Sequence, residues 1–266
     1  MGSAFAEHRA MTTTVVPATL PGQFYLGIFG GGGSSDNVNV IQYGTAFFPD
    51  LVGGPLAVNG FGPLKNNGTG WFGGAQLGYQ AQGVSLPLNL YPQWTFGPAF
   101  EIEGYWFGNR TLHGDAINNT ARLPEHDFEL SFSANRSIYL TNFVLNLNNP
   151  CYLFHPYVGF GIGGALVRLS GADSTQISPI EPGVNHFNTK TSDTNATFAG
   201  QIKAGLAYDI NEWVSIYAEY RWLYLSSTQF TFGSTVYPTH VPTSSWQVKV
   251  APQNYNLGSI GLRFNL

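Results

Sequence analysis

The side chains best able to do chemistry in this chain are six histidines, one cysteine and a few acids. No two histidines stand at a spacing typical of metal ligands, so the sequence predicts no metal site. The lone Cys151 excludes an internal disulfide and a zinc site built from cysteines. The histidines are His8, His113, His126, His155, His186 and His240.

A glycine-rich run, Gly159 to Gly164, satisfies the pattern G-x-G-x-x-G. This pattern binds a dinucleotide only where it follows a strand and opens a helix. Here it lies inside a segment of alternating residues, where glycines let neighbouring side chains fill a narrow space. We therefore expect no cofactor.

The composition limits the kind of protein that could position such residues. Only 10% of the residues are charged, against about 25% in an average soluble domain, while 43% are hydrophobic and 15% aromatic. No stretch approaches the ~18 consecutive apolar residues of a membrane-spanning helix. The formal net charge is −4 and the 11 lysines and arginines are scattered, so no nucleic-acid partner is expected.

Period-two alternation organises the chain into segments of about ten residues, which predicts β-strands. In one of them, Phe100, Ile102 and Trp106 share one parity. Glu101 and Glu103 share the other. Eight such segments lie near 23–33, 70–80, 94–107, 137–147, 156–169, 197–210, 213–225 and 254–266.

The charges of these segments fall on the face opposite the apolar one, and they are very few for water-facing strands. This favours an inverted barrel, with the apolar face in lipid and a small polar set inside. Eight strands leave an interior just wide enough for side chains, so the inward charges must pair. The predicted interior charge network is Glu101, Glu103, Lys203, Glu219, Arg221 and Arg263, and Gln76, Asn142 and Gln201 are predicted interior polar residues.

Tryptophans bracket two of the segments, as expected for the aromatic girdles of a membrane barrel. With a rise of ~3.3 Å per residue and a tilt near 40°, the bracketing pairs lie roughly 30 and 23 Å apart along the membrane normal. These distances suit an apolar band about 25 Å tall. The predicted girdle residues are Trp71, Trp94, Trp106, Trp213 and Trp222.

Long and short connections alternate strictly along the chain. Long stretches follow the first, third, fifth and seventh segments, and the others are joined by shorter turns. Outer-membrane barrels have long extracellular loops and short periplasmic turns. The fold class predicted is therefore all-β: a transmembrane up-and-down antiparallel β-barrel of eight strands, with extracellular loops and periplasmic termini.

Several strand sequences resemble the OmpA-like or opacity-type family of eight-stranded outer-membrane barrels. The resemblance rests on Pro156-Tyr-Val-Gly-x-Gly-x-Gly and Tyr220-Arg-x-Leu-Tyr-Leu, with weaker support from the first, fourth and last strands, and covers less than half of the chain. In this family a terminal assembly signal alternates apolar residues and usually ends in Phe. Ile260, Leu262 and Phe264 match that pattern, whereas the last residue, Leu266, departs from it.

The resemblance and the loop asymmetry favour a structural or surface-recognition (adhesin-like) role in the bacterial outer membrane. The alternative is a narrow porin gated by the interior salt bridges, and the third hypothesis is an enzyme acting on lipid A or peptides. His126-Asp127 and His113-Gly-Asp115 are similar to the His and Asp of outer-membrane proteases, but such neighbours arise easily by chance in polar loops. The chain is therefore expected not to be an enzyme, with no catalytic residues.

Two further regions complete the prediction. Residues 1–22 are interpreted as a signal remnant or periplasmic tail, and 23–266 as a single transmembrane barrel domain. The loop 34–69 is unusually apolar, and an exposed patch of this kind usually packs against something. It folds over its own barrel mouth, or it binds a protein partner, a neighbouring subunit or a host surface; the other expected partners are outer-membrane lipid and lipopolysaccharide.

Overall fold

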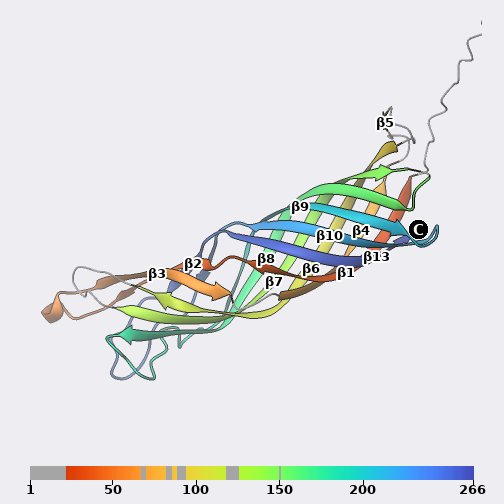
Figure 1. Ribbon diagram of the computed structural model, residues 1–266. Helices are drawn as coiled ribbons and strands as arrows, with labels where there is room; N and C mark the ends of the chain where they lie inside the picture. Colours follow the sequence, from red (N-terminus) through yellow and green to blue (C-terminus); the bar gives the residue numbers. More distant parts are fainter. Residues whose placement is uncertain (1–21, 67–69, 82–85, 89–93, 118–125, 150) are drawn as a thin grey trace, which may run out of the picture.

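Eight long strands close into a barrel in the computed structural model, which describes residues 22–66, 70–81, 86–88, 94–117, 126–149 and 151–266 (Figure 1). Each pairs antiparallel with its neighbours along the chain, and the last pairs with the first. The predicted all-β, up-and-down barrel of eight strands is thereby confirmed. In ring order the strands are β1 (Gln23–Ser35), β4 (Gly70–Gln80), β6 (Trp94–Ala116), β7 (Asp127–Asn148), β8 (Phe154–Ser178), β9 (Asp193–Asp209), β10 (Val214–Leu225) and β13 (Gln253–Asn265).

Among the described residues, no helix is long and apolar enough to cross a membrane. The segment 1–21, which makes up nearly all of the predicted tail, lies outside the described residues. A short strand, β5 (Leu86–Leu88), pairs with the start of β6 at the end of the barrel where the chain terminates (Figure 1).

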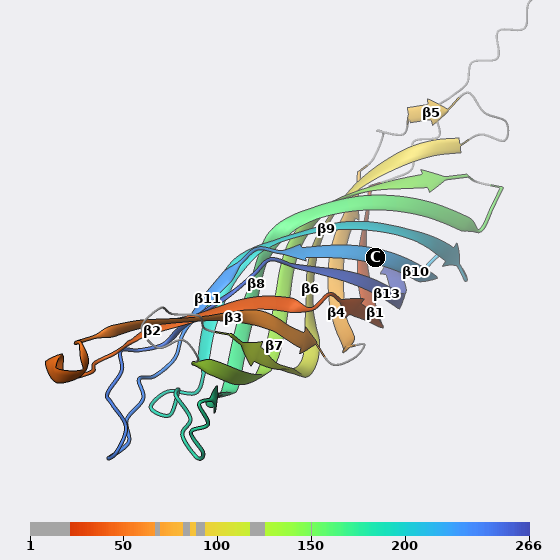
Figure 2. The ribbon, with the colours of Figure 1, turned by 60° about the vertical axis from the view of Figure 1, so that its left-hand side comes forward.

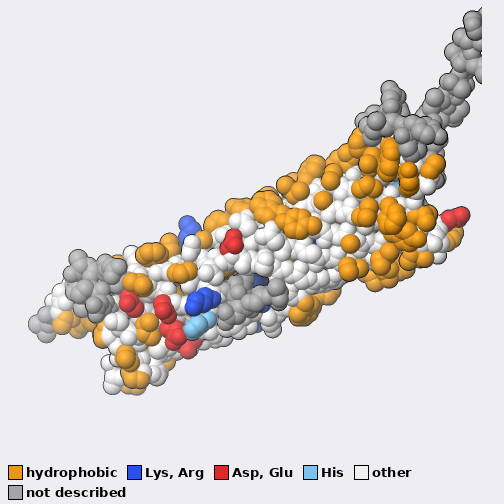
Figure 3. Space-filling model, viewed as in Figure 1, with side chains coloured by type: hydrophobic (Ala, Val, Ile, Leu, Met, Phe, Trp, Pro, Cys, Tyr) orange, Lys and Arg blue, Asp and Glu red, His pale blue; other side chains and the backbone are white. Residues whose placement is uncertain are grey.

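An apolar belt surrounds one half of the barrel because the period-two pattern places large apolar residues outward on every strand. In Figure 3 the hydrophobic side chains gather on this half, whereas acidic, basic and histidine side chains gather at the far end. The exposed belt includes Leu26, Ile28, Leu77, Phe100, Ile102, Tyr139, Phe160, Ile162, Phe198, Ile202, Ile216, Tyr220 and Ile260.

Three of the strands, β6, β7 and β8, extend well beyond the belt, and in β6 and β8 an irregularity reverses the parity of the buried side chains there. Between Phe107 and Arg110 the β6–β7 register shifts. Glu101 and Glu103 lie inside below this shift, whereas Leu112 lies inside above it. A bulge of this kind adds one residue to one strand and so turns the following side chains to the opposite face.

The strands extend beyond the belt into a second, smaller sheet formed by two loops. The hairpin β2 (Val38–Ala46) and β3 (Leu56–Asn66), joined through the 3-10 turn η1 (Asp50–Val52), comes from the apolar loop 34–69. Strand β12 (Gln247–Val250) pairs with β2, and β11 (Thr228–Thr231) pairs with β12. Figure 2 shows this extension leaving the barrel at the end opposite the C-terminus. The regions 34–69 and 226–253, expected as loops, therefore contain strands.

One face of the loop hairpin packs on the chain itself. Val40, Val58 and Leu64 are buried, and β3 pairs with β6 at Lys65 and Asn66. The other face leaves apolar side chains exposed, among them Ile41, Phe47, Val52 and Phe61. The hairpin thus covers its own extension with one face and presents the other to the outside.

Candidate functional site

The six charged residues predicted for the interior lie together inside the belt-surrounded half of the barrel. Lys203 Nζ contacts Glu101, lies 3.3 Å from Glu103 Oε2 and lies 3.6 Å from Glu219 Oε2. Arg221 contacts Glu219 and lies 2.7 Å from Glu103 Oε1. The remaining cation, Arg263 Nη2, lies 3.9 Å from Glu101 Oε1.

Neutral polar groups donate further hydrogen bonds to these acids. The Tyr25 hydroxyl donates to Glu101 Oε1 at 2.7 Å, and the Tyr157 hydroxyl donates to Glu219 Oε2 at 3.0 Å. Gln201 Nε2 donates to both Glu103 Oε1 and Asn142 Oδ1 at 2.8 Å. Three acids and three bases therefore form a neutral set in which each charge faces an opposite one, as a buried ionic cluster requires. Gln76, the third polar residue predicted for the interior, is buried beside Gly27.

Aromatic side chains fill the interior on both sides of the charge network. Towards the C-terminal end, the Arg263 guanidinium lies 4.5 Å from the centre of the Tyr25 ring. Towards the loop end, the Arg221 guanidinium lies 4.0 Å from the Phe29 ring centre. Above Phe29, a group of four aromatic rings continues the packing: Phe72, Tyr105, Phe107 and Tyr255.

The predicted girdle tryptophans lie on the outer surface at two levels. Trp71, Trp106 and Trp222 are exposed on the side of the belt nearer the loop end, as their strand positions require. Trp213 is exposed beside the turn between β9 and β10. Trp94 stacks on Tyr152 with ring centres 5.7 Å apart, near the opposite rim of the belt.

The residues of the predicted assembly signal lie on β13 and at its end. Ile260 and Leu262 face outward and are exposed, Phe264 is half-buried, and Leu266 is exposed after the strand. The Leu266 amide donates to the Phe24 carbonyl oxygen at 2.9 Å, which continues the closure between β13 and β1.

A second polar cluster lies at the loop end, in a pocket of about 360 Å³. The pocket lies between the hairpin β2–β3 and the loops β8–β9 and β11–β12. Its apolar floor includes Val58, Phe128 and Trp246, and its polar side includes Glu181 and His186. Thr239 and His240 complete this side.

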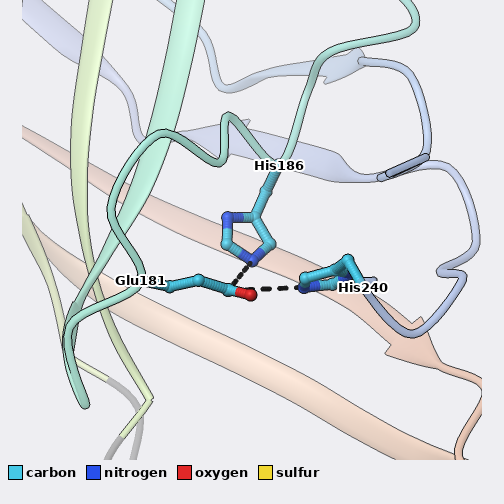
Figure 4. A group of neighbouring side chains, drawn as sticks. All are labelled: Glu181, His186 and His240. Atoms are coloured by element: carbon cyan, nitrogen blue, oxygen red, sulfur yellow. Dashed lines mark ion pairs between the residues drawn. The ribbon is translucent and has the colours of Figure 1, made fainter. Parts of the chain in front are cut away.

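In this pocket, two histidines point their Nε2 atoms at one carboxylate (Figure 4). His186 Nε2 lies 3.6 Å from Glu181 Oε2, and His240 Nε2 lies 3.4 Å from the same oxygen. On the far side of each ring, Nδ1 faces a backbone carbonyl oxygen: that of Ser174 at 2.8 Å for His186, and that of Val241 at 2.6 Å for His240.

The surroundings of His186 favour its neutral form. Its ring contacts Phe128 and Trp246 edge to face, with ring centres 5.0 and 5.8 Å apart, and its side chain is only 3% exposed. Burial lowers the pKa of His186 to about 4, and the neighbouring His240 adds to this effect. At neutral pH this imidazole is therefore an uncharged base.

The sequence pattern gave no sign of this cluster. Glu181 and His186 come from the loop between β8 and β9, whereas His240 comes from the loop between β11 and β12. Because the expectation of no metal site relied on spacing along the chain, it did not test ligands that separate loops bring together. The interior tyrosines were also missed, although Tyr25 and Tyr157 have the parity of the inward polar residues.

No protein-family model matches the chain, and no curated protein matches it. Several solved structures are similar over nearly their whole length. Neisserial surface protein A is 12% identical with a TM-score of 0.35, covering 91% of this chain and 96% of that chain. The outer membrane protease OmpT of Escherichia coli is 9% identical with a TM-score of 0.40, covering 94% and 99%. The outer membrane protein OprG of Pseudomonas aeruginosa is 12% identical with a TM-score of 0.40, covering 92% and 96%.

One expectation from the sequence is corrected by these comparisons. The chain was expected not to be an enzyme, but the structurally similar chains include an outer membrane protease. This kind of barrel is thus shared by enzymes and non-enzymes, and the exclusion does not stand. At such low identity these similarities assign no activity to this chain.

Proposed function

We propose that this chain is a bacterial outer-membrane barrel that holds a folded loop assembly at the cell surface, in a structural or recognition role. In this proposal the belt contacts outer-membrane lipid and lipopolysaccharide, the extension is extracellular, and both termini are periplasmic. The observation that carries it is the combination of an apolar exterior with an interior filled by paired charges and aromatic rings.

The belt supports a membrane location because it exposes large apolar side chains on all eight barrel strands. Soluble proteins rarely expose contiguous apolar patches of more than a few hundred Å². The charged side chains begin only beyond the belt: His113 and Glu129 form an exposed pair on the extended parts of β6 and β7. A closed barrel with a lipid-facing apolar band satisfies all backbone groups of its strands within the bilayer.

The filled interior argues against the alternative of a narrow porin. The side chains of Lys203, Glu103 and Arg221 have no exposed surface. Ions would have to break these pairs and displace the aromatic rings above them, and breaking one buried pair costs about 3–5 kcal/mol. The barrel is therefore suited to anchoring rather than to conduction.

The loop end supports a recognition role. The exposed face of the hairpin carries Ile41, Phe47, Val52 and Phe61, whose side chains are 45–66% exposed. Large exposed apolar patches often mark sites of protein–protein interaction. A protein partner or neighbouring subunit at residues 34–69 belongs to this proposal.

Labelling of single cysteines on intact cells tests the orientation. The native Cys151 lies exposed in the turn before β8, at the end that we place in the periplasm. Val236 is 61% exposed in the loop between β11 and β12. A bulky membrane-impermeant maleimide should label Cys151→Ser/Val236→Cys on intact cells, but label the wild type only after the outer membrane is permeabilised. Equal labelling of both on intact cells would refute the orientation.

Planar-bilayer recordings test the closed interior. The wild type should give no reproducible conductance steps. Steps that change in size or frequency in Glu219→Gln or Arg221→Gln would establish a water path through the charge network, and would replace the anchoring role by that of a pore.

A further inference from the structure

The cluster of Glu181, His186 and His240 has the dimensions of a metal site. Its three ligand atoms lie within 4.8 Å of one another. Two ligands bound to zinc at ~2.0–2.1 Å in tetrahedral geometry lie about 3.3–3.4 Å apart. The carboxylate oxygen of Glu181 lies 3.6 and 3.4 Å from the two Nε2 atoms, which is close to this ligand spacing.

The hydrogen bonds on the far side of both rings prepare the Nε2 atoms for a cation. A carbonyl oxygen only accepts, so Nδ1 of each histidine carries the proton that it shares with Ser174 or Val241. In the neutral ring, Nε2 then presents a lone pair. Metal-bound histidines nearly always donate their other ring N–H in this way.

Without a cation, the facing groups would not be complementary. Two Nε2 lone pairs and a carboxylate oxygen are all acceptors, and in Figure 4 both nitrogens face the Glu181 carboxylate. Either additional protons or a metal ion must lie between them. Two protonated imidazoles here would place two positive rings 5.2 Å apart, one of them packed on Phe128 and Trp246.

We propose that Glu181, His186 and His240 bind one divalent transition-metal ion of the zinc class. Two imidazole nitrogens and one carboxylate oxygen suit zinc, whereas calcium and magnesium prefer sites made of oxygen ligands. Three protein ligands leave a fourth position of a tetrahedral site for water or another small ligand. All three residues line the pocket of about 360 Å³, which has room for such a ligand.

His126 lies on the wall of the same pocket, just before β7. Its Nδ1 atom is buried and has no hydrogen-bond partner among the described residues. A water molecule bound to the metal at its fourth position would supply a hydrogen-bond partner for His126 Nδ1. The pocket therefore has an unused polar group in addition to the three proposed ligands.

The proposed ion would join two loops that are distant in the sequence. Glu181 and His186 belong to the loop between β8 and β9, and His240 to the loop between β11 and β12. Binding to the folded loops alone stabilises their closed arrangement by linkage. Zinc should therefore protect both loops from proteolysis as well as bind with defined stoichiometry.

Zinc titration of the full chain, folded in detergent and freed of metal by a chelator, tests the site. The wild type should bind one Zn²⁺ per chain in competition with a chromophoric chelator. His240→Gln and Glu181→Gln should each weaken the affinity at least about tenfold, because even loss of an outer-shell partner typically costs 10–100-fold. These two positions are more exposed than His186, so their replacement disturbs packing less.

The matched control is His113→Gln, which removes a histidine from an exposed pair with Glu129 outside the pocket. It should bind zinc as the wild type does. Heat-dependent gel mobility verifies that each variant is folded, and limited proteolysis with and without Zn²⁺ gives a second readout. A wild type that binds no zinc, or Glu181→Gln and His240→Gln variants that bind it as tightly as the wild type, would overturn the proposal.

Discussion

Replacing Lys203 by methionine should strongly destabilise the barrel, because Lys203 contacts all three interior glutamates. Once the ammonium group is removed, the carboxylates of Glu101, Glu103 and Glu219 face only two guanidinium groups. The interior then holds one uncompensated negative charge in a region without exposed surface.

The size of the effect follows from the simplest way to relieve that charge. One carboxyl group can take up a proton, and protonating a carboxyl of ordinary pKa, about 4.3, costs about 3.7 kcal/mol at pH 7. This value agrees with the roughly 3–5 kcal/mol lost when a buried pair is broken. We therefore expect Lys203→Met to lose about 3–4 kcal/mol of unfolding free energy at pH 7.

The stability deficit of Lys203→Met should depend on pH. The folded Lys203→Met variant holds a proton that its unfolded chain releases above a pH of about 4.3. Its deficit relative to the wild type should therefore shrink by about 1.4 kcal/mol per pH unit as the pH falls from 7 towards 5. The double variant Lys203→Met/Glu219→Gln restores neutrality and should recover most of the loss at pH 7.

Urea unfolding in lipid vesicles measures these differences, with folded and unfolded chains separated by gel mobility without heating. The matched control is Lys249→Met, since this lysine is exposed on β12 and its replacement should change stability by no more than about 0.5 kcal/mol. Equal midpoints for the two single variants, or a double variant no more stable than Lys203→Met, would show that water reaches the charges and would refute the reasoning.

Three further outcomes are expected. Gly31→Ala should destabilise the barrel by about 1–3 kcal/mol, because the new Cβ would lie 1.9 Å from the Gly258 carbonyl oxygen. The control Gly258→Ala meets no atom within 4 Å and should change stability by at most about 0.5 kcal/mol. Urea unfolding midpoints compare the two variants. Brominated lipid should quench a variant whose only tryptophan is Trp222, but not one that retains only the buried Trp246; equal quenching would contradict the membrane position of the belt. Phe264→Ala should slow assembly into vesicles, measured as the rate at which the folded gel band appears, if the last strand carries the assembly signal.

The belt half of the barrel could be predicted from the sequence because a single physical rule governs it. Side chains alternate between lipid and interior, so residues such as Phe100 and Glu101 reveal the strand, its faces and its environment together. The interior is similarly constrained, because charges in so narrow a barrel must meet other charges. Glu103 and Arg221 are 118 positions apart, yet parity alone assigns both to the interior.

The rule fails where the strands leave the belt. The register shift after Phe107 reverses the parity of β6. The parity of β8 reverses at Gly171, a residue with positive φ near a register shift in the β7–β8 pairing. Above these points both faces of the strands pack on protein or meet water, and the contrast between oily and polar faces is lost. The hairpin β2–β3 was noticed only as an unusually apolar loop for the same reason.

The loop pocket was beyond prediction because nothing local specifies it. His186 and His240 approach each other through the pairing of β12 with β2 and through the shared core of the extension, where the rings of Phe187 and Phe232 stack 4.7 Å apart. The sequence of that core shows neither a regular alternation of apolar and polar residues nor a recognisable motif. Its only trace in the sequence is a set of aromatic residues in regions that otherwise resemble polar loops.

The geometry of the pocket nevertheless depends on the barrel, because the two share strands. β8 starts at Phe154, at the turn end of the barrel, and continues without interruption to Ser178, three residues before Glu181. Its lower half carries the belt residues Phe160 and Ile162, and its upper half carries Ser174, whose carbonyl oxygen orients His186. A paired strand is stiffer than a free loop, so the carbonyl oxygen that orients His186 is held by the same backbone that crosses the belt. An eight-stranded barrel with a filled interior can in this way provide a rigid base for the loop end.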